Sequence, residues 1–495
     1  MRKHLLGLAI ALAVLIVSIS VWIVVSSFQK TGAPADTAIP PVATTSVNND
    51  TTVAPTTTKT AGTTTAIAAP VARGKNFTEH MRFGAEFLAL ENYEQAASEF
   101  AAAVTLEPSA IGPLLNLAEA EVQLQDFEKA RANLLAAEQL DANNPDISIL
   151  RGIIFLRENN FLEAERAFSQ AGDKAGFWSG AMAAFFDRRD EAVKLLQATT
   201  DARAPEILAA FDEYSKYTDS PKTHLDALLT RAFVAIGEYQ LALAKIGPVL
   251  EDDANYRDAW ILTGYAQFAE QKFELARESW QTAYALDSGK PETQYFLGLV
   301  SFELKNWDDA EKFFLLARGN HFEPDDLDEK LIEIYLTSGK YRAAADLLSE
   351  KINADESASI DDFTRAISLY LEKLNDGQKA WAVASLAVTR LPESSPAWNL
   401  AGWVSLKNNQ LAKARTQLEH AIQLDPKSPW PYYNLGQVFE KSGKTAAALT
   451  AYHDAFELDS NGPAGVLAAR NYNRLLSATN PDKSTANPPT DAEQQ

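Results

Sequence analysis

Between about residues 76 and 478, apolar side chains recur three and four positions apart, in segments that are separated by polar turns. This spacing places the apolar side chains of each segment along one face of an α-helix. The turns include pairs such as Gly237-Glu238, Gly339-Lys340 and Gly443-Lys444. The pattern therefore predicts a succession of amphipathic helices that are joined in pairs by tight turns.

The helices also repeat along the chain. The stretches "AWILTGYAQFAEQKFELARESWQTAYALD" at 259–287 and "AWNLAGWVSLKNNQLAKARTQLEHAIQLD" at 397–425 share Ala-Trp, Leu, Gly, a central Ala-Arg, Ala and a closing Leu-Asp at the same offsets. They begin 138 residues apart, which is four times 34 plus two, and about 34 residues is the period of a helix–turn–helix repeat. Eleven units follow this period, with starts at 77, 111, 145, 173, 223, 257, 291, 325, 359, 395 and 429. The two stretches belong to the sixth and tenth units.

Small residues occupy two fixed positions of these units. The twentieth position is alanine in nearly every unit, namely Ala96, Ala130, Ala164, Ala192, Ala242, Ala276, Ala310, Ala344, Ala414 and Ala448. The eighth position is small in most units, namely Gly84, Ala118, Gly152, Gly180, Gly264, Gly298, Ala366, Gly402 and Gly436. Antiparallel helices approach closely only where side chains are small, so we expect the eighth position to face the twentieth. Bulky residues at positions four, seven, eleven, seventeen and twenty-four would fill the space around this contact.

This small-residue and aromatic pattern resembles the tetratricopeptide repeat family. The resemblance implies an all-α fold, a right-handed superhelical α-solenoid of about eleven repeats over 76–478, in which each unit stacks on its neighbours. The sequence departs from the pattern at an insert near 207–222, which divides the array. The ninth unit carries two extra residues around "LEKLNDGQ" at 371–378, where Ala380 stands for the twentieth residue. The amphipathic segment at 463–478 is predicted to cap the last repeat.

The N-terminal segment predicts a membrane anchor. Residues 5–28 carry no charge and are long enough to span a bilayer as a helix. Arg2 and Lys3 precede this segment, and Lys30 is the only basic residue in the twenty that follow it. This bias places the N-terminus in the cytoplasm and the repeats outside it. Residues 1–28 are therefore predicted to be a transmembrane anchor in the cytoplasmic membrane, with a cleaved signal peptide as the alternative, although the apolar region of such peptides is usually shorter.

The segments on either side of the repeats have a different composition. Residues 31–70 contain thirteen Thr, many Ala and Pro, and no Phe, Trp or Tyr. Such a stretch buries too little apolar surface to offset its chain entropy. The region 29–75 is therefore predicted to be a disordered linker, and the polar residues 479–495 a disordered tail.

The remaining composition argues against an enzyme. The chain contains no cysteine, which excludes disulfides and thiol catalysis, and its net charge of −21 argues against binding to nucleic acid. The six histidines form neither a cluster nor an HExxH motif. The stretch "KSGKT" at 441–445 has Val438 where a phosphate loop requires its first glycine. We therefore expect no catalytic residues, no cofactor and no metal.

The resemblance also implies a binding surface. In the family, first helices line a concave groove through positions two, five, nine, twelve and thirteen of each repeat. Carried onto this sequence, these positions include the aromatic residues Phe177, Tyr265, Phe268, Tyr295, Phe302, Trp403 and Tyr433. No repeat shows the Lys and Asn set with which some members clamp a C-terminal carboxylate. The groove is therefore predicted to take an apolar or aromatic-containing peptide or helix, while positions five and twelve have the alternative of packing against the next repeat.

These observations together predict a membrane-anchored, extracytoplasmic scaffold that binds one or more proteins and assists the assembly of cell-envelope complexes, in a bacterium. The alternative is a binding module for glycan or cell-wall polymer, in which the groove aromatics would be stacking platforms.

Overall fold

The computed structural model of this chain describes residues 72–217, 220–322 and 324–479. These residues form 24 α-helices and no β-strand, which confirms the predicted all-α fold. The predicted anchor at 1–28, the predicted linker up to residue 71 and the predicted tail from residue 480 lie outside the described residues. No helix in the described ranges combines the length and the apolar composition that crossing a membrane requires. The chain divides into two compact units, Met1–Leu304 and Lys305–Gln495, and each is described by itself.

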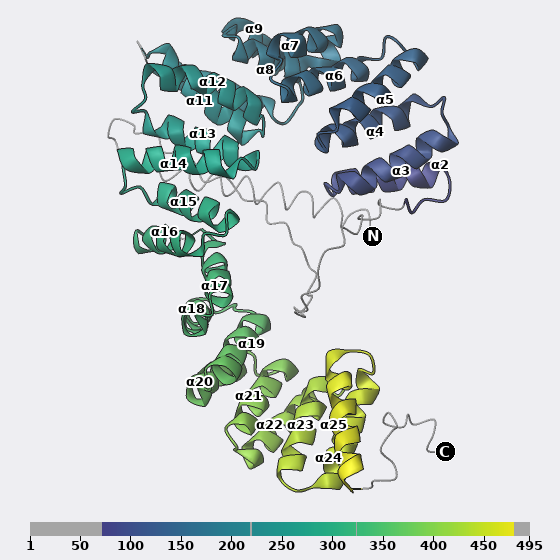
Figure 1. Cartoon of the computed structure of the whole chain (residues 1–495), viewed down its shortest axis with the longest axis vertical. Coiled ribbons are helices and arrows are strands. Elements are labelled where there is room, and N and C mark those ends of the chain that lie inside the picture. Colours follow the sequence, from purple (N-terminus) through teal and green to yellow (C-terminus); the bar gives the residue numbers. More distant parts are fainter. Residues whose placement is uncertain (1–71, 218–219, 323, 480–495) are drawn as a thin grey trace, which may run out of the picture. The chain divides into compact units, whose positions relative to one another are not determined.

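The first unit is a series of stacked helix pairs (Figure 1). Its pairs are α2 (Phe77–Ala89) with α3 (Tyr93–Leu106), α4 (Ile111–Gln123) with α5 (Phe127–Leu140), α6 (Pro145–Arg157) with α7 (Phe161–Gln170), α8 (Gly176–Phe185) with α9 (Arg189–Ala198), α11 (Lys222–Ala235) with α12 (Tyr239–Asp252), and α13 (Arg257–Ala269) with α14 (Phe273–Leu286). A 3-10 turn, η1 (Gly172–Ala175), precedes α8, the single helix α10 (Ala204–Tyr214) lies between the fourth and fifth pairs, and α15 (Pro291–Glu303) is the last helix of the unit.

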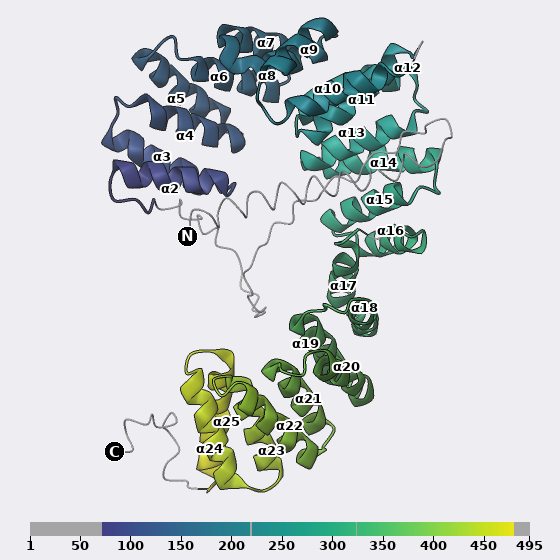
Figure 2. The same cartoon turned by 180° about the vertical axis from the view of Figure 1, so that it is seen from behind.

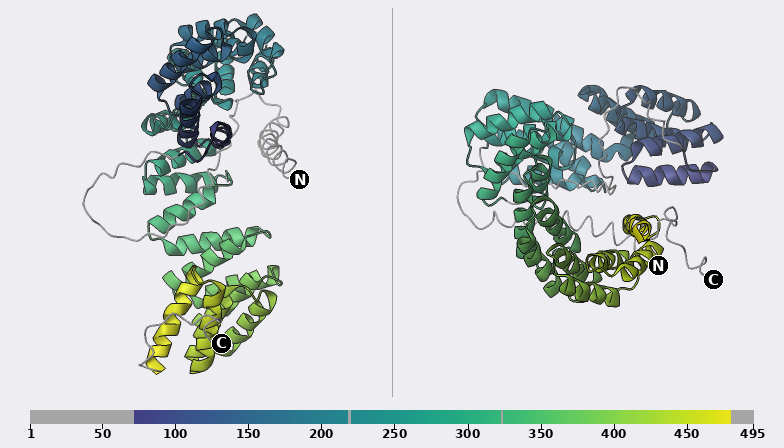
Figure 3. Two further views of the ribbon diagram at one scale, coloured as in Figure 1. Left: turned by 90° about the vertical axis from the view of Figure 1, so that its right-hand side faces the viewer. Right: turned by 60° about the horizontal axis from the view of Figure 1, so that its bottom comes forward.

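The second unit continues the same pattern (Figures 2 and 3). It begins with α16 (Trp307–Gly319) and contains the pairs α17 (Leu327–Thr337) with α18 (Tyr341–Ala354), α19 (Ile360–Ser368) with α20 (Gly377–Arg390), α21 (Ser395–Lys407) with α22 (Leu411–Leu424), and α23 (Pro429–Lys441) with α24 (Thr445–Leu458), followed by α25 (Pro463–Thr479). In the pair at 360–390 a π-helical turn, η2 (Leu369–Lys373), extends α19. This turn lies where the ninth unit has its two extra residues.

The turn between the helices of each unit has one recurring backbone conformation. Its fifteenth residue, displaced by two in the ninth unit, has a positive φ between 49° and 79°, in Glu91, Gln125, Asn159, Asp187, Gly237, Gln271, Lys305, Gly339, Asn375, Asn409 and Gly443. The next amide donates back into the first helix, as from Lys444 to the Phe439 carbonyl at 2.9 Å. This arrangement satisfies the carbonyls at the helix end, although only three of the eleven residues are glycine, which adopts positive φ most easily.

The close approach of the paired helices differs in one respect from the sequence-based expectation. The residue directly over the glycine at position eight is the large side chain at position twenty-four, not the alanine at position twenty. A Cβ added to Gly84 would lie 2.5 Å from Phe100, and one added to Gly264 would lie 2.5 Å from Trp280. The glycine therefore makes room for a whole ring, while the buried alanine beside it, such as Ala276, lets the two backbones approach.

The tryptophan shared by the two quoted stretches has a structural role. Trp260 and Trp398 each donate the indole N–H to the carbonyl six residues earlier, at Ala254 (2.8 Å) and Pro392 (2.7 Å) respectively. Both carbonyls lie in the turn that connects a repeat to the preceding one. The side chain at position four therefore fastens a first helix to the turn before it.

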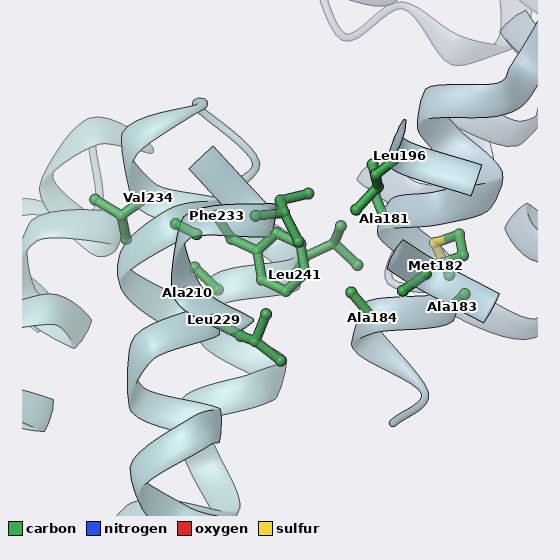
Figure 4. Close-up of a cluster of buried hydrophobic side chains, with 14 of the residues drawn as sticks. Ala181, Met182, Ala183, Ala184, Leu196, Ala210, Leu229, Phe233, Val234 and Leu241 are labelled. Carbon is green, nitrogen blue, oxygen red and sulfur yellow. The ribbon is translucent and has the colours of Figure 1, made fainter. Parts of the chain in front are cut away.

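The first part of the insert near 207–222, which belongs to α10, is in the core. Ile207, Ala210 and Phe211 of α10 are at most 3% exposed, and α10 packs on α8, α9 and α11. Figure 4 shows side chains of α8 through α12 in one cluster, with Ala210 and Phe233 among them. The predicted break in the array is therefore filled by a helix that packs on both neighbouring pairs.

Two buried ionic clusters tie together the pairs around α10. Glu238 is 3% exposed and pairs with Arg157 at 2.9 Å and Arg203 at 3.4 Å. Lys245 is 5% exposed and bonds the Phe185 carbonyl at 3.0 Å and the Asp226 carboxylate at 2.9 Å. These contacts join α6 and α8 to the α11–α12 pair. Charges buried this deeply are costly without close partners, so the contacts also fix how these helices pack.

The helix α25 occupies the place of a first helix and is the last helix of the described residues. It packs on α23 and α24 and starts one repeat length after α23. Its eighth residue is Arg470, which is exposed, where most units have glycine or alanine. A long charged side chain at this position disfavours the close approach of a second helix, which fits the predicted capping role of α25.

Candidate functional site

The second unit contains a pocket of about 520 Å³ on the side of its first helices. Side chains from α19, η2, α21, α23 and α25 line it. Figure 1 shows these helices in succession in the second unit. The lining residues include Thr364, Ser368, Glu372, Pro396, Asn399, Leu400, Trp403, Lys407, Trp430, Tyr433, Asn434, Gln437 and Leu467. The volume lies in the range of about 300–1,000 Å³ that is usual for ligand pockets.

One part of the pocket is aromatic. Trp403 lines it from α21, while Trp430 and Tyr433 line it from α23. The rings of Trp430 and Tyr433 meet edge to face, with centroids 5.9 Å apart and planes at 82°. Asn471 of α25 donates its side-chain amide to the Tyr433 hydroxyl at 3.4 Å and so orients the phenol. Burial raises the pKa of this phenol, which therefore remains a neutral hydroxyl. Trp430 remains 39% exposed and is therefore available to a ligand.

A pair of asparagines supplies directed hydrogen bonds. The side-chain amide of Asn434 donates to the side-chain carbonyl of Asn399 at 2.9 Å, across α21 and α23. This bond fixes the orientation of both amides. It leaves the NH₂ of Asn399 as a donor and the carbonyl oxygen of Asn434 as an acceptor. A peptide group, which has one donor and one acceptor, matches such a pair.

The pocket also carries one charge of each sign. Lys407 of α21 and Glu372 of η2 both line it and are both exposed. Neither forms an ion pair with another residue in the part of the chain that the structure describes. An ammonium and a carboxylate are therefore open to charged groups of a ligand, at an exposed rim where a single pair contributes up to about 1 kcal/mol.

Two of the predicted groove residues, Trp403 and Tyr433, line this pocket. Phe177 and Tyr295 are instead core residues, since they are only 3% and 5% exposed. The ring of Phe177 lies 3.8 Å from the Arg203 guanidinium. Both residues occupy position five, for which the sequence left packing against the next repeat as an alternative. The prediction that Phe177 and Tyr295 belong to a binding surface is therefore corrected, because other side chains of the protein cover both residues.

The other three predicted residues are partly buried in or beside the first unit's core and do not line the pocket. Tyr265 meets the ring of Phe296 edge to face at 6.2 Å, and burial raises the pKa of Tyr265. Phe268 packs near Trp280, with ring centroids 5.5 Å apart. Phe302 is half-buried near the end of α15. Their role in binding stays a prediction.

The sequence-based selection missed most of the polar lining and one tryptophan. Trp430, Asn399 and Lys407 stand at positions two, five and thirteen of their units, so the rule that selected Trp403 could also have found them. The predicted groove comprised only aromatic residues, and Trp430 was not among them. Asn434, at position six, carried no signal in the sequence, since its role depends on Asn399 in the next helix.

Comparison with known proteins agrees with this architecture. A tetratricopeptide repeat model matches residues 81–145, 115–176, 228–291 and 266–321, a TPR repeat model matches 404–443, and a further tetratricopeptide repeat model matches 431–461. Together these segments span about half of the chain.

Individual proteins are similar at a lower level. Superkiller complex protein 3 of Mus musculus is 24% identical over 298 residues, which are 58% of this chain and 19% of that protein, so the similarity spans about a fifth of the relative's length. The crystal structure of yeast Tom70 is 16% identical and covers 81% of this chain and 96% of its own, with a TM-score of 0.28. That of YrrB, described as a TPR protein with an unusual peptide-binding site, is 17% identical and covers 46% of this chain and 96% of its own, with a TM-score of 0.24. On the matched repeat models and the helix pairs described above, this chain belongs to the tetratricopeptide repeat family.

Proposed function

We propose that this protein is a scaffold for protein–protein interactions and that the pocket between α19, α21, α23 and α25 binds an extended segment of a partner. The observation that carries this proposal is the combination of Trp403, Trp430 and Tyr433 with the Asn399–Asn434 pair in one pocket. Aromatic side chains anchor protein interfaces because they bury a large area at a low entropic cost. The asparagine pair matches the donor and acceptor of a peptide group.

The experiment is capture of partners by the full chain from extracts of its native host, followed by mass spectrometry. Trp403→Ala is expected to weaken capture by at least thirtyfold, because truncation of a central aromatic anchor costs about 2 kcal/mol or more. Trp381→Ala is the matched control, since Trp381 is also a partly buried tryptophan of this unit but lies on α20, outside the pocket. Equal capture by both variants at equal thermal stability would contradict the assignment of the pocket.

We further propose that residues 5–28 anchor the protein in the cytoplasmic membrane and that the repeats act outside the cytoplasm in assembly of envelope complexes. The uncharged segment, the preceding Arg2 and Lys3, and the Thr-rich stretch that follows support this proposal. Protease added to cells with an opened outer barrier should digest the repeats while the anchor stays with the membrane fraction. Full protection of the repeats would reverse the orientation. Binding of purified protein to cell-wall polymer, without a captured protein, would favour the glycan-binding alternative.

A further inference from the structure

We propose that the C-terminal segment of this same chain, residues 487–493, docks in the pocket of the second unit and competes there with the partner. This inference rests on the proposed function, because it concerns the regulation of the same pocket. The segment reads Asn-Pro-Pro-Thr-Asp-Ala-Glu and belongs to the sixteen residues that follow α25. Its chemistry corresponds to the pocket at two points, which are argued in turn.

The first correspondence is between prolines and aromatic rings. Pro488 and Pro489 favour the extended polyproline conformation. Because proline already restricts the backbone, such a segment loses little conformational entropy on binding. Aromatic-lined grooves are a recurring site for such segments, since proline rings pack flat against indole and phenol faces. Trp403, Trp430 and Tyr433 form such a wall, and Trp430 is 39% exposed.

The second correspondence is electrostatic. Asp491 and Glu493 follow the two prolines, and Lys407 lies in the pocket without an ion-pair partner among the described residues. The acidic Glu372 lies on the same rim, but Lys483, the basic residue that precedes the prolines, lies outside the segment 487–493 and next to Asp482. The electrostatic correspondence therefore rests on Asp491 and Glu493 as partners for Lys407.

The connection is long enough. Leu467 of α25 lines the pocket, and the helix continues for twelve residues to Thr479, which is about 18 Å. Nine further residues lead from Thr479 to Pro488 and can span up to roughly 30 Å. The prolines can therefore return to the pocket, and a short tether keeps their effective concentration in the millimolar range, so that even a weak contact would be populated.

Disulfide trapping in the full chain tests this inference directly, because the natural sequence contains no cysteine. Thr490→Cys is combined with Ser368→Cys, which lies in the pocket, or with Thr416→Cys, which lies exposed on the second helix α22 of the tenth unit. Under mild oxidation at low protein concentration, the pocket pair is expected to form an intramolecular disulfide at least tenfold faster than the control pair. Adding Trp430→Ala should slow the pocket pair to the rate of the control. Equal rates for the two pairs, or no effect of Trp430→Ala, would overturn the docking.

Partner capture separates this inference from the proposed function. Removal of residues 480–495 is expected to increase capture severalfold, because it removes the internal competitor. If the disulfide rates are equal while Trp403→Ala still abolishes capture, the docking of the tail fails and the protein-binding pocket stands. If the pocket pair cross-links fast while Trp403→Ala leaves capture unchanged, the tail docks and the partner binds elsewhere.

Discussion

Replacement of Gly264 by alanine tests the packing that holds each repeat together. A Cβ at this position would lie 2.5 Å from both Cδ1 and Nε1 of Trp280, a distance that requires the indole to move. Trp280 is fully buried, donates its indole N–H to the Ile261 carbonyl at 3.1 Å, and stacks on Phe296 of the next repeat with ring centroids 5.0 Å apart. Displacing this ring therefore disturbs the sixth repeat and its contact with the seventh.

The magnitude follows from three opposing contributions. Overpacking of a filled core costs about 1–3 kcal/mol, and loss of the Trp280 hydrogen bond costs about 0.5–1.5 kcal/mol. Alanine recovers about 1 kcal/mol through its better helix propensity. We therefore expect Gly264→Ala to lower the free energy of unfolding by about 1–3 kcal/mol. Gly319→Ala is the control, because a Cβ at this helical position meets nothing within 4 Å and should be neutral or stabilise by up to about 1 kcal/mol.

Urea denaturation of the full chain followed by far-UV circular dichroism would measure both variants. Because repeat arrays can unfold in parts, hydrogen exchange should accompany it, and Gly264→Ala is expected to lose protection chiefly over 257–303. The opposite signs of the two glycine-to-alanine changes are the essential result. A Gly264→Ala protein as stable as the Gly319→Ala protein would refute the argument that the glycine exists to admit the ring.

Three other perturbations have defined outcomes. Glu238→Gln should destabilise the protein by up to about 3 kcal/mol in urea denaturation, because it leaves two arginines without their buried carboxylate, whereas Glu163→Gln, in an exposed pair, should change stability by less than about 1 kcal/mol. Trp398→Phe should cost about 0.5–1.5 kcal/mol in the same assay through the lost bond to the Pro392 carbonyl, and no loss would show that this bond does not fasten the turn. Burial alone would raise the pKa of Asp346, but hydrogen bonds from Lys379 and Tyr370 lower it below its usual value. The stability from this carboxylate is therefore present above about pH 4 and lost as the pH falls through the lowered pKa, so the melting-temperature difference between wild type and Asp346→Asn should be present at neutral pH and vanish in acid.

Sequence reasoning located the repeats because their signals are local. The period of about 34 residues, glycine or alanine at position eight and alanine at position twenty describe two helices and one turn that contact each other within a single unit. Even the two extra residues of the ninth unit were located, and the structure absorbs them in the π-helical turn Leu369–Lys373. The amphipathic segment predicted at 463–478 is likewise present as the helix Pro463–Thr479, which packs on α23 and α24.

Some local features still carried no signal. The turn residue with positive φ is a glycine in three units, at Gly237, Gly339 and Gly443. In other units residues such as Gln271 and Lys305 adopt the same conformation. These residues pay a conformational cost that the closely packed helix pair offsets, so their identity does not reveal the turn. The prediction that the eighth position faces the alanine at position twenty was also wrong, because the crossing of the two helices determines that the side chain at position twenty-four, Trp280 in this unit, lies above Gly264.

Only the tertiary structure decided which aromatic residues line the pocket. Tyr433 and Tyr295 both stand at position five of a first helix, yet Tyr433 lines the pocket and Tyr295 lies in the core. The difference depends on how the following repeat packs on each helix, which is a contact between residues of different units. The pocket itself is assembled from α19, α21, α23 and α25, and the bond between Asn434 and Asn399 joins two of them. Periodicity within one repeat thus determined the helix pairs, whereas the angles between repeats, which no single repeat encodes, determined the site.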